Sequence, residues 1–127
     1  MSGTVTVLMM IEDLLFGPRA ESILRKVRLN PQRYRPGVPL GEQVEGSACG
    51  LIDVGGKGPE AIQAITAIKD AGHPVVAFCG HTNEARRAEA RAAGATIVAT
   101  NGEVHGSLPA LIAKALVHKP DPDCDHC

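Results

Sequence analysis

Four apolar runs stand out along the chain, and none of them alternates strictly with polar residues. They are rich in valine, isoleucine and leucine and occupy residues 5–11, 50–52, 75–78 and 97–99. Short, continuous apolar runs are typical of strands covered on both faces, as in a parallel sheet. In the segment 30–47, Pro31, Pro36 and Pro39 exclude a central strand. We therefore predict a short edge strand at 32–38 and at most a stub of helix at 40–45.

Apolar residues at helical spacing fill the intervals between these runs. The longer predicted helices are bounded by residues that favour helix ends: Pro18, Pro59 with Gly72, Asn83 with Gly94, and Ser107. Alternating strands and helices require a parallel sheet with right-handed crossovers. We therefore predict a flavodoxin-like α/β fold: a doubly wound, five-stranded parallel sheet of order 2-1-3-4-5 with a shortened second helix. Residues 1–118 are expected to form this domain and 119–127 a polar tail.

Acidic residues follow the first and third predicted strands. Glu12 and Asp13 come directly after the first run, and Asp53 closes the run that begins at Gly50. In doubly wound sheets, ligands bind at the carboxyl ends of the strands, near the point where the strand order reverses. In the order 2-1-3-4-5 the first and third strands flank that point. We therefore expect the three carboxylates to lie in one pocket.

Over about residues 4–117 the chain resembles the receiver domains of response regulators, the CheY-like family, as a divergent member. "VLMMIEDLLFGPRAESIL" resembles the first receiver strand with its acidic pair, and "GLIDVGGKGPEAI" places Asp53 where receivers carry the aspartate that accepts a phosphoryl group. "PVVAFCGH" and "GATIVATNGEVHGSLPALI" match the fourth strand, the fifth strand and the last helix.

The resemblance implies a signalling module of a two-component phosphorelay, not an enzyme. By this resemblance Asp53 is the candidate phosphoacceptor, and Glu12, Asp13 and Asp53 are the candidate ligands of Mg²⁺. Carboxylate oxygens suit such a hard ion, which neutralises an incoming phosphoryl group while a carboxylate attacks it. The implied partner is a protein, either a kinase or an output protein.

Three positions depart from the receiver pattern. Cys79 stands where receivers carry Ser or Thr, and Asn101 stands where they carry Lys; Val98 replaces the aromatic switch residue. A thiol is a weak hydrogen-bond donor, and an amide carries no charge. We therefore expect a degenerate phosphorylation site, that of a pseudo-receiver, with a pocket edge formed by Cys79, Gly80, His81 and Asn101.

The composition of the chain gives no support for nucleic acid or a membrane as a binding partner. The net charge is −1, so nothing favours nucleic acid phosphates or an anionic membrane, and two Phe, one Tyr and no Trp give little for bases to stack on. No run approaches the roughly 20 apolar residues of a membrane span, and the N-terminus lacks an export signal. We expect a cytoplasmic protein in which Cys49 and Cys79 are buried free thiols.

Other interpretations remain open at this stage. The same acidic pocket could serve a small metal-dependent enzyme or a ligand-binding flavodoxin-like domain, although "EDLLFGPR" lacks the hydroxyls of a flavin loop and no corrin motif is present. His81 could act as a ligand or a pH sensor, and His105 could approach the same pocket. In the tail, Cys124, His126 and Cys127 form part of a candidate zinc site.

The last helix also suggests self-association. Its apolar residues cover a wider arc than one sheet-facing stripe needs, and the preceding helix is flat and rich in alanine. We therefore predict a homodimer through this end of the domain. The residues concerned are Leu108, Leu111, Ile112, Ala115 and Leu116.

Overall fold

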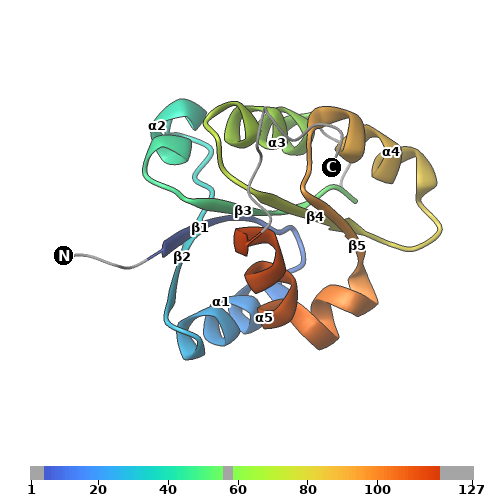
Figure 1. Cartoon of the computed structure of the whole chain (residues 1–127), viewed down its shortest axis with the longest axis horizontal. Coiled ribbons are helices and arrows are strands. Elements are labelled where there is room, and N and C mark those ends of the chain that lie inside the picture. Colours follow the sequence, from blue (N-terminus) through green and yellow to red (C-terminus); the bar gives the residue numbers. More distant parts are fainter. Residues whose placement is uncertain (1–4, 56–58, 118–127) are drawn as a thin grey trace.

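Five parallel strands form one sheet in the order β2-β1-β3-β4-β5, which confirms the predicted order (Figure 1). The computed structural model describes residues 5–55 and 59–117. The strands are β1 (Val5–Met10), β2 (Leu29–Arg33), β3 (Cys49–Asp53), β4 (Val75–Cys79) and β5 (Ile97–Thr100). The helices are α1 (Phe16–Lys26), α2 (Leu40–Glu45), α3 (Glu60–Asp70), α4 (Glu84–Ala93) and α5 (Asn101–Val117).

Helices cover both faces of the sheet. Helices α1 and α5 lie on one face, and α2, α3 and α4 lie on the other (Figure 1). Successive residues of β1 enter opposite cores: Val7 and Met9 pack with α1 and α5, whereas Leu8 packs against α3. Both sides of the strand therefore need apolar residues, which is why its sequence does not alternate.

The edge strand lies earlier than predicted. β2 occupies Leu29–Arg33 and pairs with β1 through Val5–Met9, with Pro31 opposite Val7, whereas the prediction was residues 32–38. An edge strand has only one neighbour, so it tolerates a residue without an N–H group. The next residues turn instead, held by the buried side chain of Gln43, which bonds both backbone groups of Arg35 and the carbonyl of Val38 at 2.8–2.9 Å.

The helix ends follow local sequence signals with one exception. Asn83 accepts the backbone N–H of Arg86 at the start of α4, and Gly94 ends that helix with φ of 109°. The last helix consists of two segments that meet at Ser107: the predicted helix is the second, and the first, which begins at Asn101, was not predicted. The backbone N–H of Thr100 donates to Oε1 of Glu103 at 2.8 Å, and the backbone N–H of Glu103 donates to Oγ1 of Thr100 at 3.2 Å. These two bonds form a capping box that the prediction missed. Ser107 has non-helical angles and marks a kink inside α5.

Candidate functional site

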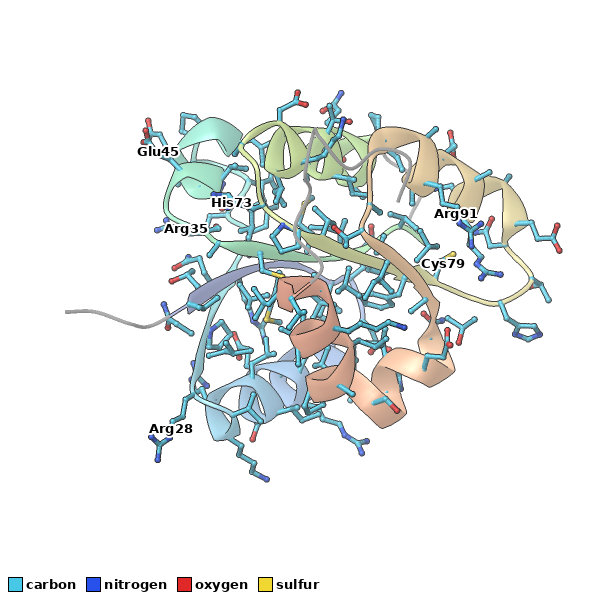
Figure 2. All side chains as sticks on the ribbon, viewed as in Figure 1. Arg28, Arg35, Glu45, His73, Cys79 and Arg91 are labelled. Atoms are coloured by element: carbon cyan, nitrogen blue, oxygen red, sulfur yellow. The ribbon has the colours of Figure 1, made fainter. Side chains whose placement is uncertain are left out.

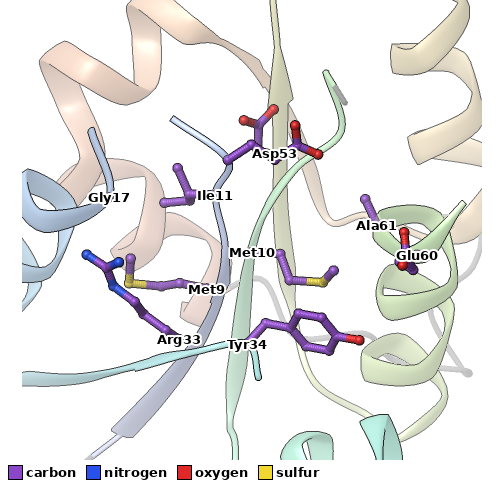
Figure 3. Close-up of a pocket in the computed structure, with 10 residues that line it drawn as sticks. Met9, Met10, Ile11, Gly17, Arg33, Tyr34, Asp53, Glu60 and Ala61 are labelled. Carbon is purple, nitrogen blue, oxygen red and sulfur yellow. The ribbon is translucent and has the colours of Figure 1, made fainter. Parts of the chain in front are cut away.

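Glu12 and Asp53 reach the same pocket at the carboxyl edge of the sheet. β1 and β3 are neighbours, with Met10 opposite Ile52, so the residues that follow these two strands emerge side by side. A pocket of about 290 Å³ is lined by both carboxylates and by Glu60 at the start of α3 (Figure 3). The sequence analysis did not identify Glu60, although an acidic residue after Pro59 in a first helical turn lies next to any ligand bound there.

We call this hollow the acidic pocket. Figure 3 shows that it wraps over the end of β1: Met9 and Arg33 lie on one side of the strand, and Met10 and Tyr34 lie on the other. The guanidinium of Arg33 is already paired, since it binds both carboxylate oxygens of Glu21 at 2.7 and 3.2 Å. The lining of the pocket therefore keeps an acidic character.

Asp13 has a different position from the one expected. Its Oδ1 accepts the backbone N–H groups of Leu15 at 2.8 Å and Phe16 at 3.1 Å, so the side chain holds the turn that begins α1. These two hydrogen bonds lower the pKa of the Asp13 carboxyl, and the charge of His105 lowers it further. Asp13 is thus engaged in local structure and is not among the residues that line the acidic pocket.

His105, on the first part of α5, contacts the α1 side of the site. Its ring stacks on Phe16 with the ring centroids 4.1 Å apart and the planes 16° from parallel. Phe16 in turn meets Phe78 edge-on at 6.0 Å, so the stack connects α5 through α1 to the core of the sheet. By contrast, His81 is exposed and does not line the acidic pocket.

Asp53 and Cys79 both lie next to Gly55. The backbone N–H of Gly55 donates to Oδ1 of Asp53 at 2.9 Å, and a Cβ built on Gly55 would stand 3.1 Å from that oxygen and 3.7 Å from Cβ of Cys79. A side chain here would crowd the carboxylate, which would have to shift by a few tenths of an ångström.

Cys79 is a poor substitute for a hydroxyl. Its side chain is buried, and its thiol donates a long 3.7 Å hydrogen bond to the carbonyl of Asn83 (Figure 2 labels Cys79 at the end of β4). Burial raises the pKa of the Cys79 thiol, and burial also raises the pKa of Cys49 to about 12. Both cysteines are therefore protonated at neutral pH and are free and buried, as predicted.

Asn101 lies beside Gly80, with its Nδ2 4.0 Å from the position of a Cβ on that glycine. This places the amide that follows β5 next to the loop that follows β4. Val98 is partly buried and packs against the core on the α3 side.

Two arginines on α4 stand near Cys79, and the sequence analysis missed both. Nε of Arg86 donates to the carbonyl of Val54, one residue beyond Asp53, at 2.8 Å. Burial raises the pKa of the Cys79 thiol most; the charges of Arg87 and Arg86 lower it and that of Asp53 raises it, so all three charges act on this thiol. No local pattern signals this contact, because 32 residues separate Arg86 from Val54.

A divalent cation fits the site only in part. Within residues 5–55 and 59–117, no three His, Cys, Asp or Glu side chains form a group that could hold a metal ion. Glu12 and Asp53 supply hard oxygen ligands in one pocket, whereas Oδ1 of Asp13 is held by the backbone of its own turn and Asp13 does not line that pocket. The tail residues Cys124, His126 and Cys127 lie outside the described residues.

Comparison with known proteins identifies the architecture. No family model matches the sequence, and the curated protein sequences give no match either. Solved structures match over most of the chain. The chemotaxis protein CheY4 of Vibrio cholerae matches with a TM-score of 0.74 and 13% identity, over 90% of this chain and 100% of that one.

Two further structures agree. A response regulator from Thermotoga maritima matches with a TM-score of 0.71 and 16% identity, over 90% of this chain and 98% of that one. A response regulator receiver protein from Sinorhizobium medicae matches with a TM-score of 0.70 and 17% identity, over 90% of this chain and 95% of that one. The chain has the receiver fold.

At these identities the match concerns the fold alone. Asp53 is the last residue of β3. The sequence resemblance to receivers makes Asp53 the candidate phosphoacceptor. The described part of the chain contains no helix long and apolar enough to cross a membrane.

Proposed function

We propose that this chain is a receiver-type regulatory module that acts by binding a partner protein, a kinase or an output protein, in the cytoplasm. The position of Asp53 carries the proposal: it ends the central strand β3 of a receiver fold, beside Glu12, at the carboxyl edge of the sheet. Leu14 and Leu15 support the protein-binding part. They are 87% and 86% exposed directly beside the Asp13 turn, and paired exposed leucines are typical of contact surfaces.

The phosphorylation site is degenerate in this proposal, with Asp53 as candidate phosphoacceptor. Cys79 directs its weak donor to the carbonyl of Asn83, and Asn101 brings an uncharged amide where, by the resemblance, a lysine would bring charge. We expect phosphorylation of Asp53 to be slow or absent, and the module to act mainly through its surface.

Incubation with acetyl phosphate and Mg²⁺, followed by intact mass measurement, tests this proposal. The expected result is little or no gain of a phosphoryl group in the wild type. Cys79→Thr combined with Asn101→Lys restores the receiver pattern and should produce a gain that is absent when Asp53→Asn is added. A full gain in the wild type that is lost in Asp53→Asn would show an intact phosphorylation site instead.

A second candidate is a metal-dependent ligand-binding domain or enzyme, which the acidic pocket favours because three carboxylates line about 290 Å³. Titration of Mg²⁺, Mn²⁺ and Zn²⁺ against thermal stability tests it, since a ligand that binds only the native state raises the unfolding midpoint. A shift that disappears in Glu12→Gln supports a cation in this pocket. Equal midpoints with and without every ion exclude this candidate.

A further inference from the structure

The arginines at the start of α4 bring positive charge to the Asp53 edge of a site otherwise dominated by carboxylates. A continuous set of contacts connects them to Asp53. The Asp53 carboxylate and Cys79 both lie next to Gly55. The Cys79 thiol donates to the carbonyl of Asn83, and the backbone N–H of Arg87 donates to the same carbonyl at 3.2 Å.

Both the side chain and the backbone N–H of Arg86 form hydrogen bonds. Its Nε donates to Val54, its Nη1 pairs with Glu89 at 3.0 Å, and its backbone N–H is capped by Asn83. These bonds attach the first turn of α4 to the loop that follows Asp53. A fixed guanidinium can bind an anion without first losing conformational freedom.

Arg87 differs from Arg86 in its hydrogen bonding. Its Nε is buried and has no hydrogen-bond partner in the described part of the chain. Buried polar groups are rarely left without a partner, and an unsatisfied one calls for a ligand or a functional role. Nε of Arg87 is thus a donor without an acceptor, on a side chain whose charge acts on the Cys79 thiol, as the charge of Asp53 does.

We propose that Arg87, supported by Arg86, binds a tetrahedral oxyanion at the Asp53 edge of the sheet. The ligand is either the phosphoryl group of a modified Asp53 or free inorganic phosphate, which present the same oxygens. Guanidinium groups match this geometry with two parallel hydrogen bonds. The inference deepens the proposed function, because it names what this site binds, and it places the positive charge on α4 where the resemblance leads one to expect a lysine on β5.

Thermal unfolding in inorganic phosphate tests the free ligand, with sodium chloride at equal ionic strength as the reference. Phosphate should raise the unfolding midpoint of the wild type. In Arg87→Gln we expect phosphate affinity to fall about ten-fold or more, because a hydrogen bond to a charged group is lost. Arg91→Gln is the matched control: Arg91 is exposed on the same helix and should leave the shift unchanged (Figure 2).

Two further variants test how charge and guanidinium geometry contribute to phosphate affinity. Asp53→Asn should strengthen phosphate binding, since it removes a negative charge beside the ligand. Arg87→Lys keeps the charge without the planar fork and should retain only part of the affinity. Arg87→Gln itself should fold normally, because Nε of Arg87 has no partner to lose; a urea denaturation curve close to that of the wild type checks this point.

Acetyl phosphate with Mg²⁺ tests the covalent ligand. If Asp53 gains a phosphoryl group, Arg87→Gln should shorten its lifetime several-fold and Arg91→Gln should not. A phosphate shift that needs Arg87 without any covalent gain leaves the oxyanion site in place and identifies free phosphate as its ligand. Equal behaviour of Arg87→Gln and the wild type in both assays, or no response of the wild type in either, overturns the proposal.

Discussion

Arg86→Met tests whether the hydrogen bond from Arg86 to Val54 stabilises the loop that follows Asp53 (the Asp53 loop) against α4. In the folded protein Nε of Arg86 bonds the carbonyl of Val54, a residue that is fully buried, while the Arg86 side chain is 17% exposed. Methionine keeps most of the apolar stem and has a helix propensity similar to that of arginine. The substitution therefore removes the bonds and changes little else.

The expected loss follows from these bonds. A hydrogen bond from a charged donor contributes about 1.5–3 kcal/mol, and its removal leaves the Val54 carbonyl without this donor. The ion pair with Glu89 adds only about 0.2–0.5 kcal/mol, since it is an i,i+3 pair whose acidic partner is 54% exposed. We expect Arg86→Met to lower the free energy of unfolding by about 2 kcal/mol.

Urea denaturation at neutral pH measures this loss, with Arg91→Met as control. Arg91 is exposed on the same helix, and its replacement should change the free energy of unfolding by less than about 0.5 kcal/mol. Hydrogen exchange adds a local measurement: the amide of Gly55, which bonds Asp53, should exchange faster in Arg86→Met and at the wild-type rate in Arg91→Met. Equal stability of the two variants would refute the attachment of α4 to the Asp53 loop.

Four other outcomes can be checked. The folded pKa of Asp13 lies below its unfolded value of about 3.9, so its carboxylate stabilises the fold above that pH and loses the effect as the pH falls through the folded pKa; the deficit of Asp13→Ala in urea denaturation should shrink on acidification. Gly50→Ala places Cβ 2.6 Å from Cδ1 of Ile68 and should cost about 1–3 kcal/mol, partly recovered in a double variant with Ile68→Val; additive losses would contradict this packing. Asp53→Asn should fold normally and raise the thermal midpoint in metal-free buffer, because it removes repulsion with Glu12 in the acidic pocket and keeps an acceptor for Gly55; a clear loss would show a satisfied structural residue. Light scattering at high micromolar concentration tests the predicted homodimer, and a monomer excludes it.

The homodimer was predicted from the wide apolar arc of the last helix, and the structure accounts for much of that arc within one chain. Leu108, Ile112 and Ala115 are buried within one chain, and Leu111 and Leu116 pack against the same core. A helix that lies over two neighbouring strands needs a wide apolar arc, which the sequence alone cannot distinguish from a second interface.

The sequence by itself determined the elements, their order and the place of Asp53. Apolar runs, together with the end signals at Asn83 and Gly94, act over a few residues and keep their meaning in any fold. Alternating strands and helices leave few topologies, so the order 2-1-3-4-5 follows once the second strand is placed at an edge. Asp53 could be located because it closes a short buried strand.

Only the tertiary structure decided which side chains meet at that strand end. Asp13 binds the backbone of its own turn, Glu60 enters the acidic pocket, and Arg86 reaches Val54 across 32 residues. The edge strand likewise took its register from pairing with β1, which allowed Pro31 inside it. Such contacts depend on the distance and direction between elements after packing, and no local periodicity or cap encodes that geometry.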